Sequence, residues 1–515
     1  MQRRLVCTAK GERPSPFHVG TNLILSRRSS IARHNNIMNN DRLSLEAISR
    51  HVDAKADDYC ALSDRIWAAP ELAFEEHRAV AEQIAMLERE GFRIARNVGG
   101  MATAFVAEWG SGGPVVGILG EFDALPDLAQ VSGVTEHKPT TGGTPGHGCG
   151  HNLLGAGSAL AAVALKDALE REGIAGTVRY YGCPAEESGS GKTFMARAGL
   201  FHDLDAAFCW HPSLVNEVQT SSSLACIQAY FRFKGRAAHA AAAPHVGRSA
   251  LDAVELMNVG VNYMREHMPS DARVHYATTN TGGSAPNVVQ AFAESLYLVR
   301  SPHLPDAERL FERVKKIAEG AALMTETSVT VQITDATSNV LPNKALQEAM
   351  YENMRRLGPP AFDAADVAFA EKLQREALTE EEILASVKPH DLSLKSKVLH
   401  DGVLAMPARE EVMMGTTDVG DVSWIVPTVQ CHTACFAIGT PFHTWQLVTQ
   451  GNLPAAHKGM VLAAKAMAAT AADVLRNPEL VARAKAELKE RNGGRDYLCP
   501  IPADVTPDDL RAKAA

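Results

Sequence analysis

The sequence predicts an α/β protein with a mostly parallel central sheet and a smaller inserted α+β domain. Short apolar runs alternate with amphipathic stretches of helical periodicity, an order typical of parallel sheets covered by helices. In the middle of the chain this order changes over about 110 residues, which is enough for a separate domain. The full length of 515 residues is also too great for one ordinary hydrophobic core, so we expect at least two domains.

The composition is that of a globular protein from a reducing compartment. Hydrophobic residues make up 46% of the chain and charged residues 22%. The net charge of −9 is small for this length and predicts neither a nucleic acid nor a membrane as a partner. No apolar run reaches the ~20 residues of a membrane span. Nine scattered cysteines, an odd number, do not form the pattern of a secreted disulfide framework, so we expect a cytoplasmic protein.

Residues 1–40 form a basic leader without hydrophobic periodicity. They contain seven arginines and lysines but a single acid, Glu12. A basic, acid-poor leader with serines is typical of a transit peptide. We favour two simpler interpretations, a disordered tail or an over-long gene start with Met38 as the true initiator. The segment is therefore excluded from the prediction of the fold.

The first part of the main domain is expected over residues 41–224. Residues 43–90 have helical periodicity, with a turn around Pro70. Apolar or alternating runs predict strands, and a long alanine-rich run predicts a helix. The strands are expected at residues 102–109, 114–119, 176–182 and 206–209, and the helix at 153–171.

The inserted α+β domain is expected over residues 225–337, followed by the second part of the main domain at 338–490 and a tail at 491–515. In the insert, strands are predicted at residues 225–234, 275–279, 291–300 and 328–333, with helices at 248–266 and 306–320. After it we expect helices from residue 343, exposed helices and loop at 371–397, a strand at 435–438 and a helix at 456–475.

Residues 146–152 read G-H-G-C-G-H-N and predict a metal site. Cys149 and His151 are two residues apart, so in an extended turn both side chains can face one ion. The glycines between them permit unusual backbone angles and leave room for the approach. Thiolate and neutral imidazole are ligands of the zinc type. The alternative for this stretch alone is a buried cysteine beside a loop histidine.

Further polar residues follow predicted strands, where the sites of parallel sheets lie. Glu186 and Glu187 are neighbours that point opposite ways on an extended chain, so one can bind metal while the other acts as a general base. The pair could also be a solvated helix start, and His211 or His443 taken singly could be a hydrogen-bonded structural histidine. Together, the five candidate ligands suit two ions that share one ligand. They are Cys149, His151, Glu187, His211 and His443.

Six motifs, in order along the chain, resemble those of one metallopeptidase family. They are G-E-F-D-A-L-P, G-H-G-C-G-H-N, P-A-E-E, W-H-P, G-R-A-A-H-A and G-T-P-F-H-T-W-Q. The family includes acetylornithine deacetylase, succinyl-diaminopimelate desuccinylase, aminoacylase and glutamate carboxypeptidases. The chain most resembles its amidohydrolase branch, in which a cysteine replaces a bridging aspartate. Within that branch, C-G-H-N-L-L-G and T-D-V-G-D-V-S-W are most similar to hydrolases of aminobenzoyl-glutamate.

The resemblance implies a zinc-peptidase-like catalytic domain with an inserted ferredoxin-like lid or dimerisation domain. It also implies two divalent metal ions, zinc or manganese, with Cys149 at or near the bridging position. The other ligands would be His151, Glu187, His211 and His443. Asn152 departs from the aspartate of many relatives, so the ligand set must be complete without that carboxylate.

The same resemblance implies roles for five further residues. Glu186 would be the general base, and Asp123 would orient a ligand imidazole. His239 matches a histidine that reaches an active site across a dimer interface in relatives. Asn287 and Arg300 match positions that hold a substrate carboxylate, for which arginine offers a bidentate fork. The alternative for Arg300 is a surface residue of a strand.

The function expected from these residues is hydrolysis of the amide of a small N-acyl amino acid. Aminobenzoyl-glutamate is the first choice of substrate, and aryl-acetyl aspartates or other N-acyl amino acids are the second. A cysteine hydrolase with Cys149 as the nucleophile is a rival from another class. A subunit that needs a catalytic paralogue is the non-enzymatic rival. We expect a homodimer, or a heterodimer with a related subunit.

Overall fold

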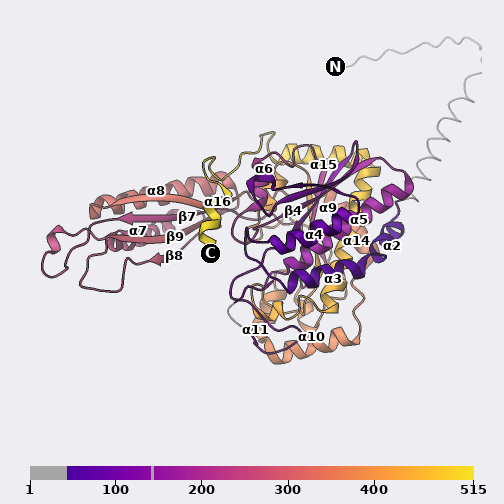
Figure 1. The fold of residues 1–515 in the computed structure, drawn as a ribbon, viewed down its shortest axis with the longest axis horizontal. Helices are drawn as coiled ribbons and strands as arrows, with labels where there is room; N and C mark the ends of the chain where they lie inside the picture. Colours follow the sequence, from indigo (N-terminus) through magenta and orange to yellow (C-terminus); the bar gives the residue numbers. More distant parts are fainter. Residues whose placement is uncertain (1–42, 141–143, 515) are drawn as a thin grey trace, which may run out of the picture.

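The computed structural model describes residues 43–140 and 144–514, so the predicted leader at 1–40 lies outside the described residues. The described chain forms a main body and a narrow arm (Figure 1). The body holds the N-terminal helices and the C-terminal part of the chain, and the arm holds the segment from β7 (Ala225–Lys234) to β10 (Ser328–Thr337). Among the described helices, none is both long and apolar enough to cross a lipid bilayer.

The body is built on a seven-stranded sheet in the order β1-β2-β4-β3-β5-β11-β6. The four neighbours β4, β3, β5 and β11 run parallel, whereas the pairs at the edges are antiparallel. The predicted mostly parallel sheet is therefore confirmed. The strands are β1 (Arg93–Arg96), β2 (Phe105–Ser111), β3 (Val115–Glu121), β4 (Gly176–Cys183), β5 (Ala206–Ser213), β6 (Glu217–Val218) and β11 (Thr428–Ala434).

Two long alanine-rich helices, α5 (His151–Glu172) and α14 (Pro454–Arg476), pack against one face of this sheet. Their small side chains allow close approach, and the buried Trp210 of β5 donates its indole N–H to the carbonyl of Leu154 at 3.0 Å. The remaining helices of the body are α2 (Leu45–Asp53), α3 (Ala56–Trp67), α4 (His77–Arg89), α6 (Gly191–Arg197), α9 (Lys344–Leu357), α10 (Ala364–Ala377), α11 (Glu380–Val387), α12 (Val419–Ser423), α13 (Trp445–Val448) and α15 (Pro478–Arg491).

The arm is a four-stranded antiparallel sheet in the order β10-β7-β9-β8, with two helices packed on it. The chain order βαββαβ is that of a ferredoxin-like unit, as expected. Alternate residues of β7 and β9 are buried, because successive side chains of a strand point to opposite faces of the sheet. The elements are β7 (Ala225–Lys234), α7 (Ala250–Met264), β8 (Arg273–Asn280), β9 (Phe292–Ser301), α8 (Leu304–Thr325) and β10 (Ser328–Thr337).

The strand predicted at residues 435–438 is wrong. The last strand of the sheet, β11, ends at Ala434, and residues 435–438 continue as buried chain without strand pairing. The apolar composition of residues 435–438 reflects their burial in the core, and a buried segment need not be paired in a sheet. The C-terminal segment contains α16 (Pro507–Ala514) and is tied to the body by the Tyr497 hydroxyl, which donates to Asp421 at 2.9 Å.

Candidate metal centre

The glycine-histidine stretch delivers two donor atoms at the N-terminus of α5. His151 is the first residue of the helix, and Cys149 lies two residues before it. Gly150 between them has φ +83°, and a Cβ there would lie 3.1 Å from Phe436 and 3.2 Å from Pro212. Glycine is required at this position for both reasons. The turn therefore holds the thiol and the imidazole at the carboxyl edge of the sheet.

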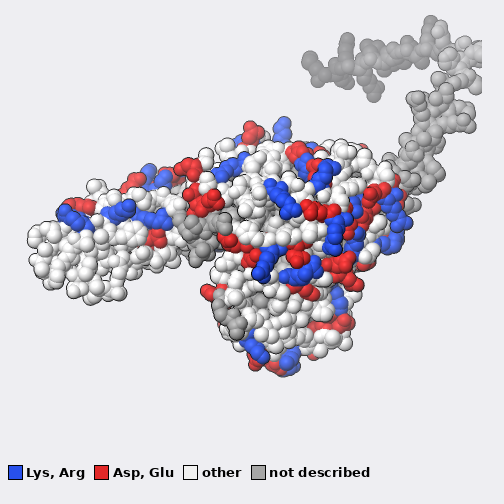
Figure 2. All heavy atoms as spheres, viewed as in Figure 1, with Lys and Arg blue, Asp and Glu red and all other residues white. Residues whose placement is uncertain are grey.

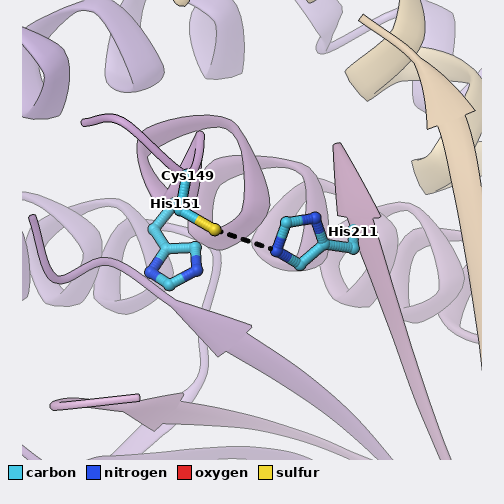
Figure 3. A group of neighbouring side chains, drawn as sticks. All are labelled: Cys149, His151 and His211. Carbon is cyan, nitrogen blue, oxygen red and sulfur yellow. Dashed lines mark hydrogen bonds between the residues drawn. The ribbon is translucent and has the colours of Figure 1, made fainter. Parts of the chain in front are cut away.

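The predicted ligands form two donor sets that share one atom. Donor atoms of Cys149, His151 and His211 lie within 4.8 Å of one another, and so do donor atoms of Cys149, Glu187 and His443. Figure 3 shows the first set, with the Cys149 sulfur pointing at the ring of His211. The side chain of His443 is 52% exposed, so the second set is open to solvent.

The spacing of the donor atoms fits metal coordination. Tetrahedral bonds of about 2.1 Å to nitrogen and 2.3 Å to sulfur place neighbouring donors about 3.4–3.6 Å apart. The Cys149 Sγ to His211 Nε2 distance is 3.4 Å, and the His443 Nε2 to Glu187 Oε2 distance is 3.5 Å. The chemistry of the donors and these separations fit two divalent ions with a common thiolate.

Both candidate ligand imidazoles of the first set are held with Nε2 available. Nδ1 of His211 lies 2.8 Å from the carbonyl of Pro212, and Nδ1 of His151 lies 2.9 Å from Asp123. Burial, followed by the neighbouring His151, lowers the pKa of His211 to about 3, so its imidazole is neutral. Asp123 also accepts the backbone N–H of Glu187 at 2.9 Å. One carboxylate thus orients a candidate ligand imidazole and the loop that carries the paired glutamates.

Glu186 and Glu187 lie beyond the end of β4, in a loop where Ala185 has φ 59°. Burial, together with the neighbouring Glu121 and Glu187, raises the pKa of Glu186 well above its usual value. Burial also raises the pKa of Glu187, although the nearby His151 opposes it. Raised carboxyl pKa values are typical of sites where a proton is taken up or where a cation binds.

Three residues that sequence reasoning did not single out complete the buried side of the centre. Lys192 of α6 is fully buried and forms ion pairs with Glu121 and with Asp418, both at 2.6 Å. Burial acts to raise the pKa of Glu121, but Lys192, His151 and His211 together leave the pKa of that carboxyl below its usual value. Glu121 belongs to the G-E-F-D-A-L-P motif, and Asp418 belongs to T-T-D-V-G-D. Their position in these motifs is the signal in the sequence that could have identified both as site residues.

The charges of the centre are unbalanced without cations. Glu121, Asp123, Glu186, Glu187 and Asp418 supply five carboxylates, whereas Lys192 supplies one ammonium group. Buried charges are costly unless they are paired or bind metal. Bound cations would offset this excess of acidic groups, which agrees with the donor geometry.

Asn152 does not face the donor atoms. Its amide donates to the hydroxyl of Ser63 at 3.0 Å and to the carbonyl of Gly451 at 2.9 Å. The departure from aspartate at this position therefore ties α5 to α3 and to the loop before α14. Both described donor sets are complete without it.

The three candidate residues of the arm lie at its two ends. Arg300 pairs with Cys226 near the body, and its Nε is buried without a hydrogen-bond partner among the described residues. His239 and Asn287 lie beyond the opposite end of β7, where the N–H of Ala240 donates to the carbonyl of Asn287 at 2.9 Å. The ten residues of β7 span about 33 Å, so the structure does not bring the three together in one chain.

The sequence matches the model of the peptidase family M20/M25/M40 over residues 117–440. It is 47% identical to one of the subunits of the p-aminobenzoyl-glutamate hydrolase of Escherichia coli, over 89% of this chain and 98% of that protein. It is also 33% identical to the Xaa-Arg dipeptidase of Mus musculus, over 86% of this chain and 91% of that protein. The crystal structure of an aminobenzoyl-glutamate utilization protein from Klebsiella pneumoniae has the same fold, with a TM-score of 0.54 at 16% identity, covering 83% of this chain and 98% of the other.

The resemblance seen in the motifs is thus confirmed over most of the chain. The chain belongs to the peptidase family M20/M25/M40 and is a metal-dependent amidohydrolase.

Proposed function

We propose that this protein hydrolyses the amide bond of p-aminobenzoyl-glutamate, releasing p-aminobenzoate and glutamate, with two divalent ions, zinc or manganese. One observation carries the proposal: two donor sets share Cys149, with Glu186 beside them. The 47% identity to a protein of a p-aminobenzoyl-glutamate hydrolase supports the substrate. Other N-acyl amino acids and dipeptides are the second candidates, supported by the dipeptidase at 33% identity.

The ions would be held by Cys149, His151, Glu187, His211 and His443. When bound, they supply a hydroxide at neutral pH and polarise the amide carbonyl. Glu186 is the residue of this chain that takes the proton of the attacking water, and it returns the proton to the nitrogen of the departing amine. Asp123 holds the His151 ring throughout, because its carboxylate accepts the Nδ1 proton at 2.9 Å.

A cysteine hydrolase is less well supported by the same site. A nucleophilic cysteine needs a depressed thiol pKa. Burial and the nearby Glu187 instead raise the pKa of Cys149 well above its usual value. A thiol in this setting is deprotonated by a bound cation, which is the state of a ligand and not of a free nucleophile.

His239 and Asn287 are proposed to serve the centre of a neighbouring subunit. Both are exposed and lie at the far end of the arm from the metal centre of their own chain. The arm also exposes large apolar side chains, and Figure 2 shows few charged residues over its outer part. Such a surface is typical of a subunit interface. The exposed apolar residues are Leu256, Val259, Tyr263, Leu323 and Met324.

The neighbouring subunit is an identical chain or a related one. The relative at 47% identity is named as one subunit of its hydrolase. Another subunit of the same Escherichia coli hydrolase is also similar to this chain, at 28% identity over 50% of it. A cytoplasmic location is proposed because all described cysteines are free, as they are in a reducing compartment.

The substrate and the metal requirement are tested with the purified chain. It is assayed alone and mixed with the Escherichia coli hydrolase subunit that is 28% identical to it. Each sample is loaded with zinc or manganese and offered p-aminobenzoyl-glutamate, indole-acetyl-aspartate and an arginine dipeptide. We expect the fastest hydrolysis with p-aminobenzoyl-glutamate, loss of activity with a chelator and recovery with metal. Resistance to the chelator together with inactivation by iodoacetamide would instead support a cysteine nucleophile.

Arg300 is proposed to bind the free carboxylate of the amino acid. Its guanidinium is close to Asp335, and Asp335 hydrogen-bonds Ser190, three residues after Glu187. Losing a charge-assisted hydrogen bond costs about 1.5–3 kcal/mol, or roughly ten- to hundredfold in kcat/KM. We expect this loss for Arg300→Ala on the acid substrate and a much smaller one on its methyl ester. An equal loss on acid and ester would show that Arg300 is structural.

A further inference from the structure

Glu121 ends β3 at the metal centre but lies outside the five-residue ligand set. Its side chain is 6% exposed, and its two oxygens face different groups. Oε1 lies 2.6 Å from Nζ of Lys192, whereas Oε2 lies 3.3 Å from Nε2 of His151. One oxygen is therefore committed to an ion pair, and the other points at a ligand imidazole.

The contact between Oε2 of Glu121 and Nε2 of His151 has the spacing of two ligands of one ion. Nδ1 of His151 faces a carboxylate of Asp123, which only accepts, so Nδ1 carries the ring proton. With Nδ1 held in this way, Nε2 is the ring nitrogen that remains for an ion, and it has no hydrogen-bond partner among the described residues. Oε2 of Glu121 lies 3.3 Å from this nitrogen, so a cation placed beside both atoms could bind the two together. The separation is close to the roughly 3.4 Å expected for nitrogen and oxygen bound to one tetrahedral ion.

Lys192 fixes which oxygen of Glu121 is free. Its side chain is completely buried, and its Nζ is also 2.6 Å from Oδ1 of Asp418. The backbone N–H of Lys192 donates to Oδ2 of the same aspartate at 2.8 Å, so both ends of the lysine are held. Asp418 can balance the ammonium charge by itself, and a simple ion pair therefore does not account for Glu121.

We propose that Glu121 is a further metal ligand, through Oε2, to the ion that His151 binds, and that Lys192 is the positioning residue that keeps Oε2 turned to that ion. Donor atoms of Glu121, His151 and Glu186 lie within 4.8 Å of one another, which places Glu121 in the same cluster as the expected general base. The inference rests on the proposed two-metal centre. It makes the two ions unequal, since the ion at His151 gains a buried carboxylate and the ion at Glu187 and His443 stays open to solvent.

The test is cobalt binding by the full chain, measured as equivalents bound, affinity in competition with a chelating dye, and visible absorption. Glu121→Gln keeps the shape of the side chain and an acceptor for Lys192. We expect it to lower the affinity for one of the two cobalt ions by at least about 10- to 100-fold. A loss of this size is typical even of residues that only hydrogen-bond a metal ligand. The ligand-field bands should shift, while the thiolate-to-cobalt band of Cys149 is kept.

Two further variants separate loss of a ligand from loss of a buried charge. Glu76→Gln makes the same substitution at a buried carboxyl group that accepts the N–H of Ala185 at 2.9 Å, on the same loop, but is in no donor set among the described residues. It should bind both cobalt ions as wild type does. Glu121→Asp keeps the charge beside Lys192 but moves the carboxylate oxygens away from the ion. It should therefore lower the affinity for the same cobalt ion, while the unfolding temperature of the metal-free protein stays near that of the wild type.

The inference is overturned if Glu121→Gln and Glu121→Asp bind two cobalt ions with wild-type affinity and an unchanged spectrum. In that case Glu121 serves only as an ion-pair partner of Lys192, and the proposed hydrolase activity stands. If the wild-type chain binds fewer than two ions, the two-metal centre fails and the inference fails with it.

Discussion

Glu186→Gln is expected to reduce kcat by at least about 10²- to 10⁴-fold, the contribution typical of a general base. The amide has the shape of the carboxylate but cannot take the proton of the attacking water. Glu186 is in none of the described donor sets that contain Cys149, so both metal ions should remain. Metal content and kcat on p-aminobenzoyl-glutamate are the two measurements.

Glu187→Gln is the matched comparison, because the two glutamates are adjacent on one loop. Oε2 of Glu187 lies 3.5 Å from Nε2 of His443, within the second donor set. This variant should lose metal as well as activity. If both variants lose metal equally, or if Glu186→Gln keeps most of its activity, the proposed division of labour between the two carboxylates is wrong.

Cys149→Ala is expected to release at least one metal ion and to remove most activity. Its thiol is the donor that the two described ligand sets have in common, so its loss weakens both sites together. The number of ions that remain after dialysis, measured by elemental analysis, gives the direct readout. The affinity of the remaining ion should also be lower than in the wild type.

Cys209→Ala provides the control for removal of a buried thiol near the centre. Cys209 lies two residues before His211 on β5 and donates to the side chain of Gln430, at 3.3 Å, outside the described donor sets. It should keep both ions. Full occupancy of both sites in Cys149→Ala would show that this cysteine is structural, and it would remove the bridging role.

The sequence by itself determined the types of residue at the centre and their place at the strand ends. Cys149 and His151 are two residues apart, and short-range spacing of this kind leaves a signature that can be seen without a structure. His211 lies in a predicted strand-end motif, and the carboxyl ends of parallel strands meet at one edge of a sheet. Periodicity also predicted the insert, because β7 and β9 bury alternate residues in an antiparallel sheet.

Only the tertiary structure decided which groups surround those ligands. Lys192 and Asp418 are 226 residues apart in the chain, and nothing local to either residue predicts that they meet. Likewise, β7 separates His239 from Arg300 by its whole length, although both belong to the same inserted segment. Residue type and spacing act over a few residues, whereas burial, charge pairing and the distance between two ends of a strand result from packing of the whole chain.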